Sequence, residues 1–399
     1  MPQLDPLTLT LLAATLASVG VYAAGIWATA RHVRRRTHAH PAPAAFPPVS
    51  LVKPLKGVEE QLEQNLRACF EQDYPAPIEL VFSSCEAHDP ALEVARRVAA
   101  SYPHVPSRFV RSDPSFGLNP KVANLEGARA AARYDLVLHS DANVRMPRDY
   151  LRRVVSELLA EDAGLLSSMV VGVGERSVGA AMENLQLSAL IAPATCAALH
   201  VAGVTCVIGK SMLFRRSQLA AVGGFESVRD ILCEDFIIGR AYERAGLRVV
   251  LSATAVQNVN ERASVRAFLG RHSRWLKMRA VIHLGSFLLD LLSNPFGLAV
   301  FAWLSSGLDP SVGVAVGAVL ALKLGGDLWL VRATRGEPMA FAHLALGPLK
   351  DLLMLPVWGY SAVSRSARWR GVRLRFGRDS RLRPDEGNLS VRVARRLLG

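Results

Sequence analysis

The sequence predicts a doubly wound α/β domain held at a membrane by apolar helices. Strand-like and helix-like runs alternate between residues 49 and 141 at the spacing of a parallel sheet. A charge-free segment of 23 residues precedes this region and three apolar blocks follow it. These signals divide the chain into an N-terminal anchor, a basic proline-rich linker, the α/β domain, a C-terminal membrane region and a basic tail: 1–30, 31–48, 49–280, 281–363 and 364–399.

The charge-free segment, residues 7–29, is long enough to cross about 30 Å of hydrocarbon as a helix. The basic run RHVRRRTHAH follows it directly, whereas a cleaved signal peptide carries its positive charge before the apolar region. We therefore expect an uncleaved anchor in a bacterial inner membrane. The positive-inside rule places Met1 outside and residue 31 onward, including the α/β domain, in the cytoplasm.

The chain has 47 Lys and Arg against 34 Asp and Glu, a net charge of +13. The excess gathers at 31–36 and 365–396, beside apolar segments, so anionic lipid headgroups explain it better than nucleic acid does. The five cysteines form no CxxC or Cys/His metal spacing, which indicates reduced thiols rather than disulfides or structural zinc. No protein partner is evident.

The α/β region begins after the stiff linker PAPAAFPP. In such sheets, ligands bind at the carboxyl ends of the strands, which directs attention to the polar residues there. Apolar alternation predicts strands at 49–55, 78–85, 107–112 and 134–141, and helical spacing predicts helices at 62–72, 90–102 and 124–134.

The three C-terminal apolar blocks are 284–307, 311–331 and 340–363. The middle block is a good membrane span. The first is broken by Asp290 and Asn294-Pro295, and the third by Pro348 and Lys350-Asp351. We expect one of these two broken blocks to be interfacial, which leaves the tail in the cytoplasm.

The run LVLHSDANV ends a strand on Asp141, with Asn143 two residues later. Two oxygen ligands at that place suit a hard divalent cation that also grips a diphosphate. A helix N-cap or an Asx turn explains them equally well. Asp89, in SSCEAHDP, precedes a helix-opening proline, and helix capping is its simplest explanation taken alone.

Two further polar groups lie in apolar surroundings. Glu234 and Asp235, in ILCEDFIIG, are costly to bury unless they bond a partner. A partly desolvated carboxylate is what a general base requires. In GLNPKVANL, the residues Asn119, Lys121 and Asn124 gather after a short strand, where the lysine can meet a phosphate.

The motifs of several enzyme classes are missing from the sequence. It has no GxxxxGK[ST] and no GxGxxG, so kinases, ATPases and dinucleotide oxidoreductases lose their main support. It also lacks the hydrolase signatures GxSxG and HExxH.

RHSRW contains Arg271, Arg274 and Trp275 and lies just before the membrane region. A snorkelling basic collar on an interfacial helix would explain it on its own. However, Asp89, Asp141 and Asp235 precede it in order, as in the D, D, D, (Q/R)xxRW series of inverting family-two-type glycosyltransferases with the GT-A fold.

The chain resembles the ceramide glucosyltransferase family more closely still. The blocks that carry this resemblance cover about residues 49–376 and occur in the family's order: VSLVKPLKGVE, QNLRACFEQDYP, HDPALEV, GLNPKVANL, YDLVLHSDANVR, GVTCVIGKSML, CEDF, RHSRWLKMR and RWRGVRLRFG.

The resemblance implies a role for each matched residue. Asn143 stands where many relatives have a second aspartate, and Ala192 where animal members have a histidine. The implied roles are uracil binding by Asp89; metal binding by Asp141 with Asn143; base catalysis by Asp235 beside Glu234; closure over the diphosphate and the acceptor by Arg271, Arg274 and Trp275; and donor-side positions for Lys53, Lys121, Asn119, Asn124 and Cys206.

The expected activity is transfer of glucose from UDP-glucose to the primary hydroxyl of ceramide, with Mg²⁺ or Mn²⁺ as cofactor. A hopanoid-type lipid glycosyltransferase using UDP-N-acetylglucosamine or another UDP-sugar shares nearly every motif and stays open. A processive polysaccharide synthase needs more convincing spans than this chain has. A basic lipid-binding protein explains the anchor and the charge but not three acids at strand ends.

Overall fold

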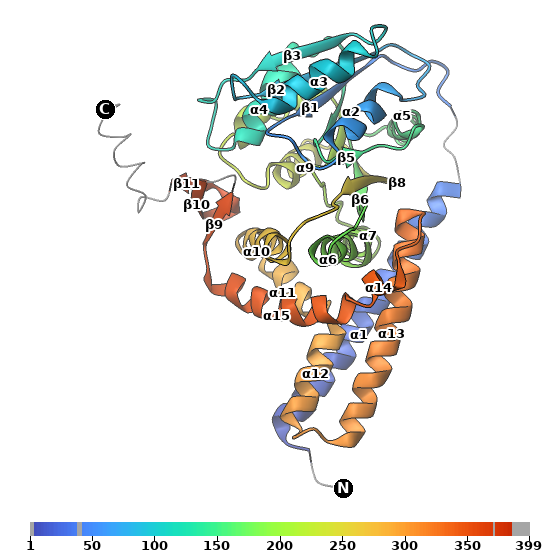
Figure 1. The fold of residues 1–399 in the computed structure, drawn as a ribbon, viewed down its shortest axis with the longest axis vertical. Coiled ribbons are helices and arrows are strands. Elements are labelled where there is room, and N and C mark those ends of the chain that lie inside the picture. The colour runs from blue at the N-terminus through green and yellow to red at the C-terminus, as the bar shows by residue number, and fades with distance from the viewer. Residues whose placement is uncertain (1–3, 38–41, 370–371, 385–399) are drawn as a thin grey trace.

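The computed structural model describes residues 4–37, 42–369 and 372–384, and its centre is an eight-stranded mixed sheet (Figure 1). The strand order is β3-β2-β1-β4-β7-β6-β8-β5. The strands are β1 (Val49–Pro54), β2 (Ile78–Ser84), β3 (Ser107–Arg111), β4 (Leu136–Ser140), β5 (Val144–Arg145), β6 (Leu165–Val173), β7 (Ser211–Arg215) and β8 (Val249–Val259).

The first half of the sheet is parallel, as the alternating pattern predicts. Strands β3, β2, β1 and β4 pair in parallel and are connected by helices. The last of these helices begins earlier than predicted, because Asn119 caps it and Pro120 occupies its first turn. The connecting helices are α2 (Leu62–Phe70), α3 (Pro90–Ala100) and α4 (Pro120–Ala131).

The second half of the sheet is mixed. Strand β7 lies antiparallel between β4 and β6, and β5 lies antiparallel to β8. After β6 the chain forms a long helix beyond the carboxyl edge of the sheet and re-enters from that edge, so β7 runs in the opposite direction (Figure 1). The predicted α/β fold class is confirmed, and the parallel pairing predicted for residues 49–141 is found in β3, β2, β1 and β4; the strands that follow them add the antiparallel pairs.

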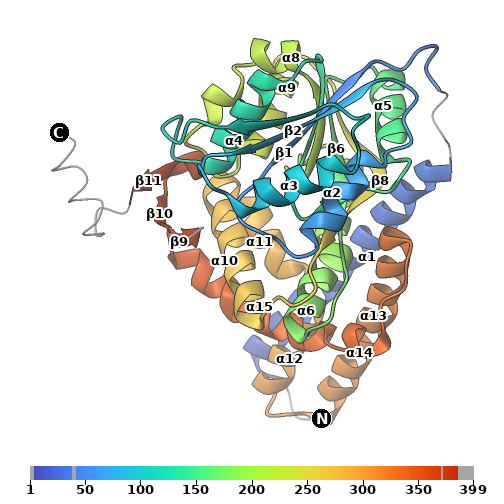
Figure 2. The ribbon, with the colours of Figure 1, turned by 45° about the horizontal axis from the view of Figure 1, so that its top comes forward.

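Alternate residues of the central strands face two separate cores. Leu51 and Leu138 pack on one face beneath α2, α3 and α5 (Tyr150–Ala160), while Val52 and Val137 pack on the other (Figure 2). Both faces of the sheet are buried, which explains why the sequences of these strands are nearly continuous runs of apolar residues. The second face is covered by α4, α8 (Arg216–Ala221) and α9 (Glu234–Arg244), with η3 (Phe225–Val228) between α8 and α9.

Two long helical segments lie between the carboxyl edge of the sheet and the apolar bundle (Figure 1). The first is continuous over residues 178–202 and contains a π-helical turn; it is apolar and long enough to count as a membrane span, although half of it is buried within the protein. The segments are α6 (Val178–Gln186), η2 (Leu187–Ile191) and α7 (Ala192–Ala202), and α10 (Val265–Ile282).

The apolar bundle contains α1, α12 and α13 side by side, running in alternating directions (Figure 1). α1 and α13 are each long and apolar enough to cross a membrane, while α11 and α12 together form a pair bent by 65°. α15 has 17 residues and lies across the bundle (Figure 1). The helices are α1 (Pro6–Val33), followed by η1 (Arg34–Thr37), and α11 (Leu284–Leu292), α12 (Pro295–Ser305), α13 (Pro310–Arg335), α14 (Phe341–Leu344) and α15 (Gly347–Val363).

Charged residues inside the bundle neutralise one another. Lys323 of α13 pairs with Asp327 one turn later at 2.5 Å and with Asp351 of α15 at 3.2 Å. The hydroxyl of Tyr22 on α1 donates to Asp327 at 2.9 Å. Because polar groups in an apolar environment are costly unless paired, this cluster holds three helices together.

The first part of the predicted tail packs against the α/β domain. It forms a small antiparallel sheet with β9 (Ser366–Trp369), β10 (Val372–Phe376) and β11 (Leu382–Pro384), and η4 (Arg378–Ser380) precedes β11. The Leu382 N–H donates to the Asp230 carbonyl at 2.7 Å. This part of the tail therefore lies on the same side of the bundle as the main sheet; residues 385–399 lie outside the described part of the chain.

Candidate active site

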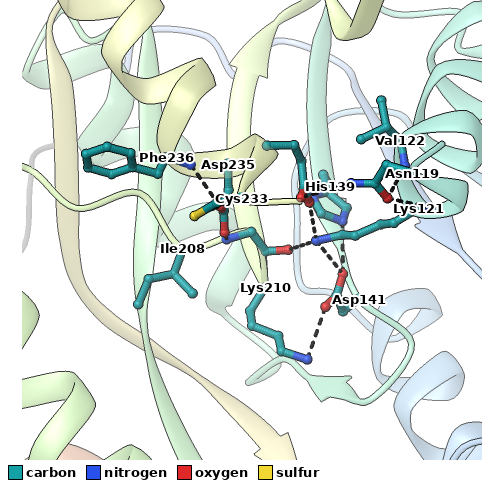
Figure 3. A network of polar contacts seen from close by, with 12 residues as sticks. Asn119, Lys121, Val122, His139, Asp141, Ile208, Lys210, Cys233, Asp235 and Phe236 are labelled. Carbon is teal, nitrogen blue, oxygen red and sulfur yellow. Dashed lines mark hydrogen bonds and ion pairs between the residues drawn. The ribbon is translucent and has the colours of Figure 1, made fainter. Parts of the chain in front are cut away.

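Asp141 lies at the carboxyl end of β4, at the centre of a charged network (Figure 3). Its carboxylate oxygens lie 3.4 Å from the Lys121 amine, 3.1 Å from the Lys210 amine and 3.2 Å from His139 Nε2. Burial alone would raise the pKa of Asp141, but the two lysines and the histidine bring it well below its usual range. Asp141 is therefore a stable anion at neutral pH.

Lys121 joins Asp141, at the end of β4, to the acids that begin α9. Asn119 caps α4 and so places Lys121 in the first turn, aimed across the carboxyl edge of the sheet. The Lys121 amine lies 2.8 Å from Glu234 and donates to the Gly209 carbonyl at 3.0 Å. Burial would lower the pKa of Lys121, but the surrounding carboxylates raise it, so the amine stays charged.

Glu234 and Asp235 begin α9 and have different surroundings. Glu234 is 5% exposed and is held by Lys121 and by Asn119 at 3.4 Å. Burial, assisted by the charge of Asp235, raises the pKa of Glu234 against the opposing effect of Lys121. Asp235 is half-buried and accepts from the Gly209 N–H at 2.6 Å. Of the two acids, Asp235 is the more accessible.

Gly209 allows this close approach. A Cβ at this position would lie 2.9 Å from both the Asp235 carboxylate and the Lys121 amine. Any side chain there would push the two charged groups apart. The glycine therefore sets the spacing between the predicted base and the lysine that neutralises the site.

Lys53, Asn119 and Asn124 hold the scaffold of the site. The Lys53 amine is fully buried and donates to the carbonyls of Asp141, at 2.7 Å, and Val144. Burial lowers the pKa of Lys53. Asn124 donates to the Leu55 carbonyl at 3.1 Å. These contacts shape the turns after β1 and β4.

Asp89 caps α3, the simplest of the explanations that the sequence allows. One carboxylate oxygen accepts from the N–H groups of Ala91 and Gly57, at 2.9 and 3.0 Å, and the other from the Ser84 hydroxyl at 2.7 Å. An ionised carboxylate offers about four acceptor positions, so three donors leave one for a ligand. Its role in uracil binding stays a prediction.

Asp141 and Asn143 have the arrangement that a cation site needs. Both side-chain oxygens converge on one point, where the Lys210 amine lies 3.1 Å from Asp141 and 2.9 Å from Asn143. Hard oxygen ligands of this kind suit Mg²⁺ or Mn²⁺, and a donor diphosphate would complete the coordination. Within residues 4–37, 42–369 and 372–384, no three His, Cys, Asp or Glu side chains converge as a metal site. The Asp141 and Asn143 oxygens would thus supply two ligands to a divalent cation, and in this structure the Lys210 amine lies between them.

The RHSRW motif lies on α10 and contacts α6. The Arg271 guanidinium lies 3.0 Å from Glu183 and donates to Asn260 at 3.2 Å, and His272 lies 3.2 Å from the other Glu183 oxygen. Trp275 is half-buried and meets the His272 ring edge-on, with 5.2 Å between centroids. Arg274 is also half-buried on α10.

A short backbone path joins this helix to the predicted metal site. The Val259 N–H donates to the Asn143 carbonyl at 2.9 Å, and the next residue, Asn260, accepts from Arg271. Arg271 is thus linked to the turn that contains Asn143 through two consecutive residues, Asn260 and Val259. Glu183 and Asn260 together fix the position of the Arg271 guanidinium beside that turn.

Cys206 lies between α7 and β7, close enough to Arg279 and Asp235 for their charges to affect the pKa of its thiol. Burial raises the pKa of its thiol. Arg279 continues α10 beyond RHSRW and pairs with Asp290 of α11 at 2.9 Å. A small pocket of about 30 Å³ opens beside this pair, between polar side chains and the apolar side chains of α11 and α15; its lining includes Gln186, Arg279, Asp290, Asn294, Asp351 and Trp358.

Sequence reasoning missed four residues that shape the site. Lys210 and His139 stand within motifs that were recognised, GVTCVIGKSML and YDLVLHSDANVR, but neither shows its partner in the sequence. Glu183 is the one acid in the apolar run AAMENLQLSAL, and an acid in such surroundings is a signal that could have found it. Ser380, buried in the tail, accepts from the Cys233 N–H just before α9, and no local pattern indicates that.

The chain is similar in sequence to known ceramide glucosyltransferases. Ceramide glucosyltransferase 1 from Caenorhabditis elegans is 27% identical over 278 residues, which cover 69% of this chain and 59% of that protein. Ceramide glucosyltransferase 3 from the same organism is 25% identical over 86% of this chain and 75% of its own length. The chain thus spans less than two thirds of the first relative.

Among solved structures, the chain is similar to a mannosyltransferase from Pyrobaculum calidifontis in complex with GDP-Man and Mn²⁺, with a TM-score of 0.47, 19% identity and coverage of 85% of this chain and 99% of that one. S. aureus TarS 1-349 in complex with UDP-GlcNAc has a TM-score of 0.39 and 14% identity, covering 84% and 97%. The profile of glycosyl transferase family 21 matches residues 10–382. The chain therefore belongs to glycosyl transferase family 21.

Proposed function

We propose that this protein is a membrane-bound inverting glycosyltransferase that moves glucose from UDP-glucose to the primary hydroxyl of ceramide. The observation that carries the proposal is the network of Asp141, Lys121, Glu234 and Asp235 at the carboxyl edge of the sheet, facing the apolar helices. Its charges suit a nucleotide diphosphate, and its position suits an acceptor that arrives from a membrane. The similarity to ceramide glucosyltransferases supports the same acceptor class.

Inversion requires one carboxylate to take the proton of the acceptor hydroxyl while the diphosphate leaves from the opposite face of the sugar. Asp235 is our candidate, because it is the accessible member of the acid pair and two backbone N–H groups orient it. Glu234 is fixed on Lys121, so it supports the site rather than moving a proton. Arg271, Arg274 and Trp275 would close over the diphosphate and the acceptor.

Asp141 and Asn143 would hold the divalent cation, Mg²⁺ or Mn²⁺. Bound there, the ion would neutralise charge on the departing diphosphate. We expect EDTA to abolish transfer by the purified protein and added Mg²⁺ or Mn²⁺ to restore it. Full activity in excess chelator would contradict this role.

The apolar helices would hold the enzyme in a membrane, with the start of α1 outside and the α/β domain in the cytoplasm of a bacterium. The basic run after α1 supports this orientation. The lipid would approach along α10 and α15, where the pocket beside Arg279 and Asp290 combines polar and apolar side chains. Asp89 would bind the uracil on the other side of the site.

The test is transfer by purified full-length protein in detergent, with UDP-glucose, UDP-galactose and UDP-N-acetylglucosamine each offered with ceramide or a hopanoid alcohol. Products are identified by mass spectrometry, and the Asp235→Asn variant controls for contaminating activity. Glucosylceramide is the expected product. A hopanoid glycoside alone would favour the second acceptor class, and no transfer from any donor would overturn the proposal.

A further inference from the structure

Lys210 occupies the position where the two predicted metal ligands converge. It stands in the turn before β7, and its amine points at Asp141 (Figure 3). The amine lies 3.1 Å from one Asp141 oxygen and donates to the side-chain amide oxygen Oδ1 of Asn143 at 2.9 Å. A carboxylate and an amide oxygen that face one point make a cation site, and here the cation is an ammonium.

Lys121 is also near Asp141, but it is held differently. The Lys121 amine is additionally bound to Glu234 at 2.8 Å and to the Gly209 carbonyl at 3.0 Å. Among the residues that the structure describes, the Lys210 amine contacts only Asp141 and Asn143, and its flexible four-carbon stem starts from a turn. Lys210 is therefore the lysine that can leave while the acid pair of α9 stays neutralised.

A divalent cation and the Lys210 ammonium cannot share this position. Both need the same Asp141 and Asn143 oxygens, and two like charges at such short separation repel each other strongly in a site with little access to water. The backbone reinforces the arrangement, because the Asp141 N–H donates to the Lys210 carbonyl at 3.1 Å and so keeps the two turns together.

We propose that Lys210 is a built-in competitor of the divalent cation: its ammonium fills the Asp141–Asn143 position, and a metal ion binds there only by displacing it. The inference rests on the metal-binding role in the proposed function. Its consequence is that the free protein binds metal weakly, and that the diphosphate oxygens of the donor, which add ligands, favour the exchange of ammonium for metal.

The test measures Mn²⁺ binding to purified full-length protein without nucleotide, from the paramagnetic resonance signal of free Mn²⁺. Lys210→Met should bind Mn²⁺ at least about tenfold more tightly than the unchanged protein, which is about 1.4 kcal/mol. Lys56→Met is the matched control: it removes one lysine charge from the same domain, where the amine pairs with Glu86 at 3.3 Å, and should leave the affinity unchanged.

A second measurement needs no variant. Acetylation of the Lys210 amine in the unchanged protein, quantified by mass spectrometry, should increase when Mn²⁺ is added, because the amine is released. Equal Mn²⁺ affinity of Lys210→Met and the unchanged protein, no binding by the variant, or Lys210 labelling that ignores Mn²⁺ would each overturn the inference. Neither readout uses a sugar donor or a lipid, so a protein that shows the competition but transfers no sugar would refute only the proposed function.

Discussion

Replacing Asp235 by asparagine separates the chemical role of this residue from its structural one. Both carboxylate oxygens accept a backbone N–H, from Gly209 at 2.6 Å and from Phe236 at 2.8 Å. Asparagine keeps the shape but has only one acceptor oxygen, so one N–H group loses its partner. We expect the free energy of unfolding to fall by about 1–3 kcal/mol.

The effect of Asp235→Asn on turnover should be larger than its effect on stability. Loss of a positioned base typically lowers the rate about 10²–10⁴-fold. The nucleotide is expected to be held by other groups, so UDP affinity should stay nearly unchanged. Turnover is measured from glucosylceramide formation and affinity by calorimetric titration with UDP.

Glu234→Gln is the matched variant, because it changes the neighbouring acid by the same single atom. Glu234 is buried against Lys121 at 2.8 Å, and breaking a buried ion pair costs about 3–5 kcal/mol. Asp141, at 3.4 Å, still neutralises part of the lysine charge and reduces this cost. We therefore expect a larger loss of stability than for Asp235→Asn, measured by thermal unfolding in detergent, and a smaller loss of turnover. The reverse ranking of turnover would mean that Glu234 is the base.

Three other features lead to predictions. Glu183→Gln should lower kcat/KM by about 10²-fold, because Arg271 loses the partner that positions it, and Glu183→Asp should lose less; equal activity of all three proteins would contradict this. Ser380→Ala removes the acceptor of a partly buried N–H before α9 and should lower the free energy of unfolding by about 1 kcal/mol, seen as a lower melting temperature; an unchanged melting temperature would show that this contact contributes nothing. A cysteine in place of Leu308, at the far end of the bundle, should react with an impermeant thiol reagent outside intact cells, whereas one in place of Arg365 should not; the opposite pattern would invert the proposed orientation.

Much of the architecture follows from local pattern in the sequence. The four parallel strands and their helices up to Asp141 lie close to their predicted ranges, because apolar periodicity reports which residues each element buries. The strand-end rule accounts for Asp141 and Lys121, which follow the parallel strands β4 and β3 at one edge of the sheet. Glu234 and Asp235 begin α9 after the antiparallel β7, so only the tertiary packing brings them to that edge. The family blocks indicate the same residues.

Other features were decided only by the tertiary structure. Four of these features join segments that are far apart in the chain: the antiparallel pairing of β7, the Lys210 amine between Asp141 and Asn143, the pairing of Arg271 with Glu183, and the packing of Ser380 against the start of α9. No periodicity encodes such a pairing. A buried charge pairs with whichever opposite charge the packing of distant elements brings within reach, because leaving a buried charge unpaired costs a large free energy of desolvation.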